Sequence, residues 1–399
     1  MVGYFKRSFQ GLPKNVWSLA VVMLINRSGM MVVPFLSLYM LDVLGWSKTQ
    51  AGIGTSVYGL AGLLGAFAGA WLCDIYGTYK VLMVSLIVAG FSFFAYPLIT
   101  EFYALISWIF VTVCIADMMR PAIFTAISDY SDKDNVARGI SLIRMAINLG
   151  IAIGPAVGGF LAFHYGYNWL FIVDGITCLI AAVALYLLVE DKPIIKVNDK
   201  LKKTKQSPYT DKSFLLFMAL NLIVLTAFFQ ILYTTPVYLK EVLGIQENLI
   251  GWFFTANGLM IFLFEMPIIF YLEKKSHFPP LVIGGFMIGL SYLIFPLCPY
   301  VLPAIILHSL LIGFGEIMNF PFISTIGLGR AGEANKAQYM GAVSVVFSLG
   351  LIVASVVGLP LVELIGFELF YYIMGGIACI ASLLLWLIRH RVSKSVLDF

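Results

Sequence analysis

Charged residues are scarce in this sequence. They make up 12% of the 399 residues, whereas 61% are hydrophobic and the mean hydropathy is +0.95. Soluble domains carry about 25% charged residues and about 45–50% apolar ones, so this composition cannot cover a surface that faces water. The chain is therefore predicted to be an integral membrane protein.

Several classes of function lack the residues that they need. The net charge is only +4 and the 25 basic residues are scattered, which argues against nucleic-acid binding. The five cysteines lie in or beside apolar stretches, so neither a disulfide framework nor a zinc site is expected. No GxxxxGK[ST] nucleotide loop, HExxH motif or nucleophile elbow occurs in the sequence. We therefore expect no ATP-driven pump, no enzyme and no metal.

Long apolar segments are what the sequence does contain. A helix needs about 20 apolar residues to cross the hydrocarbon core of a bilayer, and its backbone must form its hydrogen bonds within the helix. Twelve such segments can be placed, and the polar segment 191–212 divides them six and six. The predicted spans are 16–41, 49–73, 80–99, 102–128, 139–164, 168–190, 213–240, 247–272, 279–299, 301–327, 338–364 and 366–389.

The predicted fold class is an all-α membrane protein with twelve transmembrane helices in two pseudo-symmetric six-helix bundles. The bundles are 1–190 and 213–399, and the charged segment 191–212 is a cytoplasmic linker. Cytoplasmic loops hold the excess of Lys and Arg. Twenty of these residues fall on the side of the termini and the linker, against two, Lys48 and Lys240, in the opposite loops. Both termini are therefore expected in the cytoplasm.

The two halves also repeat each other in sequence. DVLG at 42–45 matches EVLG at 241–244, and Gly52 and Gly59 match Gly251 and Gly258, all at an offset of 199. Seven further residues match at an offset of 200: Pro121, Asn135, Ala137, Leu149, Gly150, Gly158 and Gly166 match Pro321, Asn335, Ala337, Leu349, Gly350, Gly358 and Gly366. Six spans separate the equivalent helices, so the repeat preserves orientation. This layout is typical of transporters that rock one bundle against the other around a midplane site.

Two motifs point to a family. The loop after the second span, GAWLCDIYGTYK at 69–80, resembles the loop motif of major facilitator superfamily transporters, although Ile75, Thr78 and Tyr79 occupy positions that are usually basic. The fifth span contains GxxxGPxxGG at 150–159, which resembles a motif associated with drug and proton antiporters of that superfamily. The resemblance covers essentially the whole chain.

Shorter matches favour a subgroup. The stretch 25–40, the pair Arg120–Pro121, FEMP at 264–267 and Gly315–Glu316 resemble the bacterial multidrug-resistance (drug:proton antiporter) members. The resemblance implies a conformational role for the loop carboxylate, held by cations and helix dipoles, and for the glycine-rich seam. An ordinary tight turn and simple helix packing are the alternatives. The predicted gating residues are Gly69, Asp74, Gly77, Lys80, Arg144, Gly150, Gly154, Pro155, Gly158 and Gly159.

Ionisable residues inside spans are functional candidates, because each costs about 2.5–3.5 kcal/mol at the bilayer centre. We predict that Glu265 and Glu316 couple transport to protons, since each lies near the middle of a span in the C-terminal half. The alternative for each is a permanently protonated packing group. Asp174 lies near the end of a span and is interpreted as helix-end chemistry.

A second set of polar residues is predicted to line the substrate cavity. Arg27 has no acidic neighbour within a turn, so it needs a carboxylate from another helix or an anionic ligand group. Asp117 and Arg120 are neighbours on one helix and either neutralise each other or contact substrate. Aromatic and amide side chains supply polar points in an apolar pocket, or serve packing alone. The predicted cavity residues are Asn26, Arg27, Tyr58, Asp117, Arg120, Tyr233, Asn257 and Asn319.

These features together predict a monomeric secondary active transporter in the bacterial cytoplasmic (inner) membrane. It works by alternating access on a proton gradient, without a cofactor, and exports amphipathic or cationic small molecules. Its partners are the substrate, protons and the lipid bilayer. The alternative is proton-coupled uptake of a peptide or another zwitterionic or anionic solute, with Arg27 and Arg120 at its carboxylate, although the ExxER pattern of peptide carriers is missing. A transport-inactive membrane sensor is the remaining alternative.

Overall fold

A computed structural model describes residues 12–130, 136–191, 207–272, 275–330 and 336–392. These residues form helices and no strands, which confirms the all-α prediction for them. Most of the predicted linker, at 192–206, lies outside the described residues, as do both chain ends.

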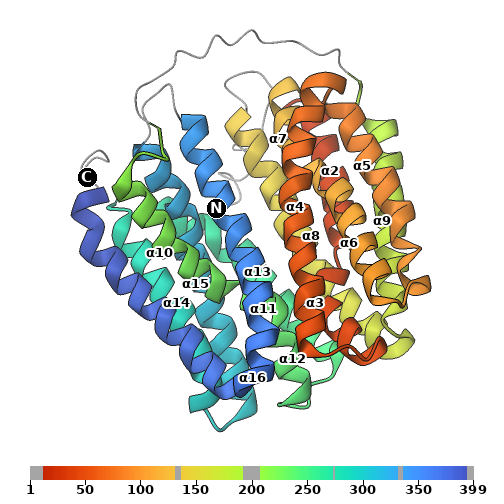
Figure 1. Cartoon of the computed structure of the whole chain (residues 1–399). Coiled ribbons are helices and arrows are strands. Elements are labelled where there is room, and N and C mark those ends of the chain that lie inside the picture. The colour runs from red at the N-terminus through yellow and green to blue at the C-terminus, as the bar shows by residue number, and fades with distance from the viewer. Residues whose placement is uncertain (1–11, 131–135, 192–206, 273–274, 331–335, 393–399) are drawn as a thin grey trace. The chain divides into compact units, whose positions relative to one another are not determined.

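The helices follow one another along the whole described chain (Figure 1). They are α2 (Lys14–Ser28), α3 (Val32–Leu38), the π-helical turn η1 (Tyr39–Val43), α4 (Lys48–Tyr76), α5 (Thr78–Phe93), the 3-10 turn η2 (Tyr96–Leu98), α6 (Phe102–Asp117), α7 (Met119–Tyr130), α8 (Val136–Tyr165), α9 (Asn168–Leu188), α10 (Lys212–Phe228), α11 (Gln230–Tyr233), α12 (Thr235–Glu241), α13 (Glu247–Leu272), α14 (Phe278–Leu297), α15 (Val301–Arg330) and α16 (Lys336–Val392).

Eleven stretches of the described residues are long and apolar enough to cross a membrane. The last stretch, Gln338–Val392, has 55 residues, more than twice the roughly 20 that one crossing needs. Its Gly366 has φ 77° and ψ 165°, so two helices meet at this residue. The structure therefore contains the twelve helical crossings that were predicted.

The sequence repeat is also a repeat of backbone conformation. Gly45 and Gly244, which match at the offset of 199, both have φ 67°. Gly166 and Gly366, which match at the offset of 200, have φ 90° and 77°. Residues other than glycine rarely adopt these positive φ values. The matched glycines therefore make the same turns in both halves.

The chain divides into two compact units. Unit 1 consists of Met1–Gly45, Leu60–Val197 and Ile245–Leu259. Unit 2 consists of Trp46–Gly59, Asn198–Gly244 and Met260–Phe399. The first part of α4 thus belongs to unit 2 and the first part of α13 belongs to unit 1.

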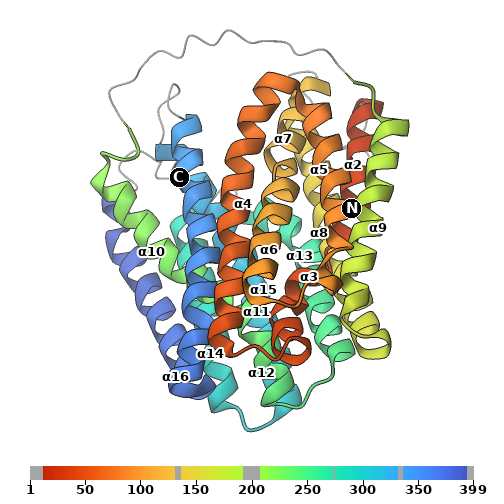
Figure 2. The same ribbon diagram turned by 45° about the vertical axis from the view of Figure 1, so that its right-hand side comes forward.

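In unit 1, α2 packs against both α8 and α9, and α5 packs against α6, α7 and α9 (Figures 1 and 2). Their facing side chains form one apolar core. It includes Leu19, Met23, Leu82, Ile123 and Ile143, each at most 2% exposed. This packing fixes the position of the first membrane helix, which carries several of the predicted site residues.

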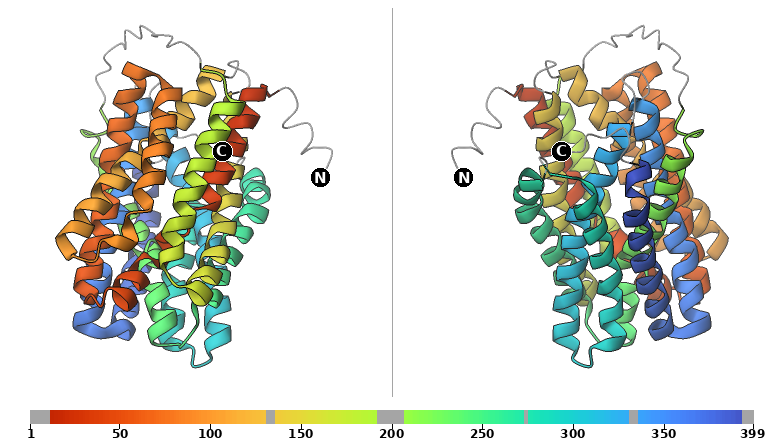
Figure 3. Two further views of the ribbon diagram at one scale, coloured as in Figure 1. Left: turned by 90° about the vertical axis from the view of Figure 1, so that its right-hand side faces the viewer. Right: turned by 90° about the vertical axis from the view of Figure 1, so that its left-hand side faces the viewer.

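In unit 2, α14 packs against α15 and α16, and α10 packs against α16 (Figures 1 and 3). The interior contains a cluster of aromatic rings. Tyr292 and Tyr371 stack with their centroids 5.5 Å apart, and Phe295 lies 4.7 Å from Tyr238 and 4.4 Å from His308. The cluster joins α12, α14, α15 and α16 into one body.

Candidate transport site

The first membrane helix is broken near its middle. α2 ends at Ser28 and α3 begins at Val32, with 29–31 between them. Asn26 and Arg27 lie in the last turn of α2. The geometry of the break therefore determines where these two side chains point.

Two contacts orient the polar residues before the break. The Asn26 Nδ2 atom donates to Cys178 Sγ on α9 at 3.4 Å. The Arg27 Nη1 atom donates to Met30 Sδ at 3.2 Å. Both side chains are half-buried. The structure thus brings these two predicted cavity residues together at one position in unit 1.

The predicted glycine motif of α8 packs against this break. A Cβ atom at Gly150 would lie 2.6 Å from the Arg27 Cβ, and one at Gly154 would lie 3.1 Å from the Met30 carbonyl oxygen. Gly158 continues the same face one turn further along. Residues with a side chain would push the two helices apart, so the glycines permit this close approach.

Another face of the same motif packs against the first part of α13. A Cβ atom at Gly251 would lie 3.1 Å from the Gly159 Cα and 3.2 Å from the Pro155 carbonyl carbon. One at Gly159 would lie 2.9 Å from the Gly251 Cα. The five motif residues are therefore shared between two helix contacts of unit 1.

Asp117 and Arg120 form the ion pair that their spacing predicts. The Arg120 Nη2 and Asp117 Oδ2 atoms are 2.8 Å apart. The Arg120 side chain is 54% exposed, and the Asp117 side chain is 15% exposed. Gly62 of α4 faces the carboxyl group, since a Cβ there would lie 3.5 Å from the Asp117 Cγ. The pair thus presents its guanidinium, and not its carboxylate, outside the packed core.

Tyr58 and Tyr233 lie together in unit 2. The Tyr233 hydroxyl is buried, hydrogen-bonds with Ser355 and interacts with the Tyr58 hydroxyl. The Ser355 Oγ lies 3.3 Å from the Oγ of Ser56, two residues before Tyr58 on α4. This polar group joins α4, α11 and α16.

The two predicted amide residues occupy separate positions. Asn257 belongs to the part of α13 in unit 1 and is 5% exposed. Asn319 belongs to unit 2, is fully buried and donates from Nδ2 to the Leu281 carbonyl oxygen at 2.8 Å. Asn319 thus connects α15 to α14.

Glu265 and Glu316 belong to neighbouring segments of unit 2. Both side chains are half-buried, Glu265 on α13 and Glu316 on α15. The rings of Phe264 and Phe314, close to them in sequence, have their centroids 5.7 Å apart. The segments that carry the two carboxyl groups therefore face each other.

The predicted loop motif forms the turn between α4 and α5. Gly77 has φ 88°, a conformation that favours glycine, and Asp74 and Lys80 are exposed. Gly69 packs against the backbone at the junction of α6 and α7. Arg144 is exposed on α8.

The sequence matches the Major Facilitator Superfamily model over residues 16–354. The chain belongs to this superfamily. It is therefore a multi-pass membrane protein and a secondary transporter of small molecules, and not an enzyme.

Curated relatives of this facilitator are distant. It is 24% identical over 369 residues to the uncharacterized MFS-type transporter YqjV of Bacillus subtilis, covering 88% of this chain and 87% of that protein. It is 24% identical over 411 residues to a Na(+), Li(+), K(+)/H(+) antiporter of Planococcus maritimus, covering 93% and 95%. It is 24% identical over 302 residues to the quinolone resistance protein NorA of Staphylococcus aureus, covering 74% of each.

Solved structures show the same fold. A POT family transporter in complex with 5-aminolevulinic acid has a TM-score of 0.83 at 18% identity, over 97% of this chain and 98% of that one. The nucleoside transporter NupG, in a mutant form, has a TM-score of 0.77 at 14% identity, over 94% and 99%.

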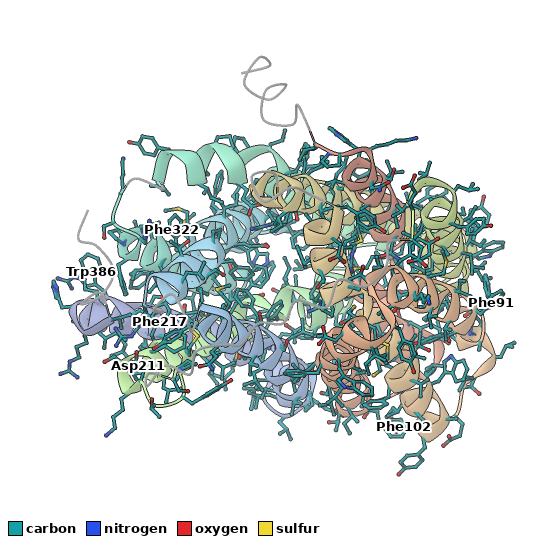
Figure 4. The ribbon with its side chains drawn as sticks, turned by 90° about the horizontal axis from the view of Figure 1, so that it is seen from above. Phe91, Phe102, Asp211, Phe217, Phe322 and Trp386 are labelled. Atoms are coloured by element: carbon teal, nitrogen blue, oxygen red, sulfur yellow. The ribbon has the colours of Figure 1, made fainter. Side chains whose placement is uncertain are left out.

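The facilitator also contains an ion-pair cluster that was not predicted. Arg330, at the end of α15, donates to both carboxyl oxygens of Asp211, from Nε at 2.5 Å and from Nη2 at 2.8 Å. Tyr339 donates to Asp211 Oδ2 at 3.1 Å. Asp211 Oδ1 also accepts from the Phe214 N–H at 3.1 Å and so caps α10, whose early residue Phe217 is labelled with Asp211 in Figure 4. An Asp directly before an apolar helix was the available signal.

This cluster fixes the charge of Asp211. Burial by itself would raise the pKa of the carboxyl group. The hydrogen bonds from Arg330 and the Phe214 N–H favour the charged form more strongly, so the pKa of Asp211 is lowered below its ordinary value.

Proposed function

We propose that this facilitator exports amphipathic or cationic small molecules in exchange for protons. The observation that carries the proposal is the double packing of α8, whose glycines contact the broken first helix on one face and α13 on another. Contacts between bare backbones allow one segment to shift along another without rebuilding a set of side-chain contacts, as alternating access requires. The relatives NorA and the Planococcus antiporter, which are named for drug resistance and for cation/proton antiport, support exchange as the mode of transport.

Glu265 and Glu316 are the residues that we propose for proton coupling. A charged carboxylate inside a span is costly, so each group gains by binding either a proton or a cation. A cationic substrate near such a carboxylate favours its charged form and therefore promotes release of the proton. Linkage makes the effect reciprocal, because a bound proton lowers the affinity for the substrate by the same factor.

Asn26 and Arg27 of the first helix and Arg120 of α7 are the substrate contacts that we propose first. Asn26 and Arg27 lie at the break, and Arg120 presents a guanidinium that is 54% exposed. These groups provide hydrogen-bond donors, and a few such polar points in an apolar pocket suit amphipathic ligands. The further proposed contacts are Tyr58, Asp117, Tyr233, Asn257 and Asn319.

A second group of residues has a proposed conformational role. Gly69 and Gly77 shape the packing and the turn of α4, Asp74 and Lys80 present charges near helix ends, and Arg144 presents a charge on α8. We place the protein in the bacterial cytoplasmic membrane as a monomer, with both termini in the cytoplasm. The bacterial relatives and the distribution of Lys and Arg support this location and orientation.

Flux measurements in proteoliposomes test the proposal. Purified protein is reconstituted under an imposed pH gradient, and uptake of a lipophilic cation and of a dipeptide is measured side by side. We expect the cation to move against the direction of the protons, with the flux abolished when an ionophore collapses the gradient. Vesicles with the Glu316→Gln variant are the inactive control, and vesicles with Glu368→Gln, an exposed glutamate of unit 2, are the matched active control.

The same experiment decides the second candidate function, which is uptake of a peptide or another zwitterion with protons. The Arg27 guanidinium beside the Asn26 amide favours it, because this pair suits a carboxylate ligand. Accumulation of the dipeptide together with protons, without movement of the cation, would replace export by uptake.

A further inference from the structure

Asp174 is a buried carboxylic acid that the proposed transport mechanism does not use. It lies in the second turn of α9 and is 5% exposed. Its position near the end of an apolar segment predicted ordinary helix-end chemistry. In the structure its partners come from a part of the chain more than 140 residues away.

These partners are the backbone N–H groups of the last residue of the break and of the first residue of α3. The Met31 N–H donates to Asp174 Oδ1 at 3.0 Å, and the Val32 N–H donates to Oδ2 at 3.4 Å. The first N–H groups of a helix have no acceptor within it, and an oxygen of a side chain can take that place. The Met31 N–H also donates to the Gly29 carbonyl oxygen at 2.6 Å, so Asp174 is a second acceptor for Met31 and supplies the Val32 N–H from another helix.

The next residues of α9 complete this contact with the break. Thr177 packs against Gly29, where an added Cβ would lie 2.7 Å from the Thr177 Cβ. Thr177 Oγ1 also donates to the Asp174 carbonyl oxygen at 3.0 Å. Cys178 accepts from Asn26 at 3.4 Å. One face of α9 therefore contacts both the break and the polar turn before it.

The contact of α8 with the break has a different character. There the glycines of α8 approach the backbone at Arg27 and Met30 through van der Waals contact. Such contacts fix a distance but have little directional preference, whereas two hydrogen bonds to one carboxyl group fix an orientation. Asp174 is thus the directional contact, and the glycine face permits sliding.

The second half of the chain connects its corresponding break differently. Gln230, which matches Met31 at the offset of 199, donates from Nε2 to the Ala354 carbonyl oxygen at 3.0 Å. The position that matches Asp174 at the offset of 200 is Met374, a buried apolar residue. The repeat therefore conserves a break in both halves, but only the first half positions it with the carboxyl group of another helix.

We propose that Asp174 is a positioning residue of the transport cycle, which fixes the break of the first membrane helix and so directs the side chains of Asn26 and Arg27. The effect on transport rests on the proposed function. The effect on the backbone at Met31 and Val32 does not, so the two are tested separately.

Hydrogen–deuterium exchange of the full chain in detergent tests the backbone effect. In Asp174→Ala both carboxyl oxygens are lost, and we expect the Val32 amide to exchange about tenfold faster and the Met31 amide, which keeps the Gly29 carbonyl oxygen as an acceptor, to exchange faster by a smaller factor. In Asp174→Asn one acceptor oxygen is kept, so the increase is smaller. Leu185→Ala, which opens a cavity at a fully buried residue of the same helix, is the matched control and leaves these two amides unchanged.

Transport assays with the same variants test the effect on the cycle. We expect Asp174→Asn to raise the half-saturating concentration of the lipophilic cation, while Leu185→Ala lowers only the amount of folded protein. If Asp174→Ala does not fold, Asp174→Asn alone decides. Exchange at the wild-type rate at Met31 and Val32 in the folded Asp174 variants, or an equal increase along all of α2 and α9, would overturn the proposal. Failure of the cation to be transported by the wild type would refute the proposed function and leave the exchange result valid.

Discussion

Each unit joins equivalent helix ends, but the two units use different side-chain chemistry to do so. In unit 1 the Tyr167 hydroxyl lies 3.0 Å from Asp42 Oδ2 and 3.0 Å from Glu247 Oε1, and we call these three residues the tyrosine turn. In unit 2 the Lys48 Nζ lies 2.8 Å from Glu241 Oε2 and 5.4 Å from the ring centroid of Phe367, and we call these residues the lysine turn. The offsets of 199 and 200 match the residues in pairs: Asp42 with Glu241, Lys48 with Glu247 and Tyr167 with Phe367.

The difference shows that duplication fixes a position without fixing its chemistry. A hydroxyl group has one hydrogen and can donate it to only one carboxylate at a time. The hydrogen bonds of the tyrosine turn therefore depend on the positions of the protons on its three side chains. Burial, followed by the charges of Asp42 and Glu247, raises the pKa of Tyr167. The lysine turn is an ordinary ion pair with its side chains 27% and 37% exposed. The two turns should therefore respond differently to substitution and to pH.

The largest expected effect is at the glycines that follow the two turns. In Gly251→Val the new side chain meets the backbone of Pro155 and Gly159, which cannot move aside. In Gly52→Val, the matched control, it meets mainly the ring of Pro360. We expect Gly251→Val to lower the free energy of unfolding by up to about 3 kcal/mol and to cost more than Gly52→Val, because overpacking against backbone cannot relax. Thermal unfolding in detergent measures both, and an equal or larger loss for Gly52→Val would contradict the comparison.

The next largest loss of stability is expected at Asp211, the residue directly before α10 in unit 2. Asp211→Asn removes a charge-assisted contact with Arg330 and should lower the free energy of unfolding by about 2 kcal/mol at neutral pH. Because the folded pKa of Asp211 lies below its ordinary 3.8, this stabilisation is present above that pH and is lost as the pH falls through the folded pKa. The wild type should therefore approach the stability of the variant in acid.

The control for this acid dependence comes from unit 1. There the Tyr130 hydroxyl donates to the Glu190 carbonyl oxygen, and Tyr130 matches Arg330 at the offset of 200. This contact contains no carboxylate, so Tyr130→Phe should lower stability by the same amount at neutral and at acid pH. Unfolding curves from about pH 2 to about pH 7 measure both variants. A constant gap between the wild type and Asp211→Asn over that range would show that the Arg330 contact does not stabilise the charged form.

A smaller effect is expected in the tyrosine turn. Tyr167→Phe introduces the residue that the lysine turn has at position 367, and it removes the donor for two carboxylates. We expect a loss of about 1 kcal/mol in the free energy of unfolding. Since the folded pKa is raised, the stabilisation from Tyr167 is present below its ordinary pKa of 10.0 and is lost as the pH rises through the folded pKa. An alkaline pH titration of unfolding should show this loss in the wild type and not in Tyr167→Phe.

The smallest effect is expected in the lysine turn. Lys48→Met removes a partly exposed ion pair, which contributes about 0.2–1 kcal/mol. The effect should shrink further at about 1 M salt, where charges are screened over about 3 Å. Thermal unfolding at low and high salt measures it. A larger loss than in Tyr167→Phe would reverse the ranking of the two turns.

The fold was predictable because a bilayer requires long apolar segments, and these are visible in the local sequence. Apolar length alone located the crossings, and helical spacing alone paired Asp117 with Arg120. The break at 29–31 was missed, because the segment around it is long and apolar enough on average to be one helix, although Asn26, Arg27 and Ser28 directly precede it. It needs the carboxyl group of Asp174, whose partners are distant in sequence.

The site was predictable only in part for the same reason. Glycine spacing identified the faces of α8 that pack closely, since small residues at intervals of four lie on one side of a helix. Local pattern did not identify which polar groups meet across helices, such as Asp211 with Arg330. The proton-coupling role of Glu265 and Glu316 stays a prediction, because it depends on charge movement during transport.

The most direct test of the account is a simultaneous measurement of proton and substrate flux. Proteoliposomes that enclose a pH-sensitive dye receive a gradient of a lipophilic cation without an initial pH gradient. We predict that the wild type and Glu368→Gln move protons in the direction opposite to the cation, whereas Glu316→Gln and Glu265→Gln, purified as folded proteins, do not couple the two fluxes. Proton movement at the wild-type rate in both Glu265→Gln and Glu316→Gln would contradict the claim that these carboxyl groups couple export to protons.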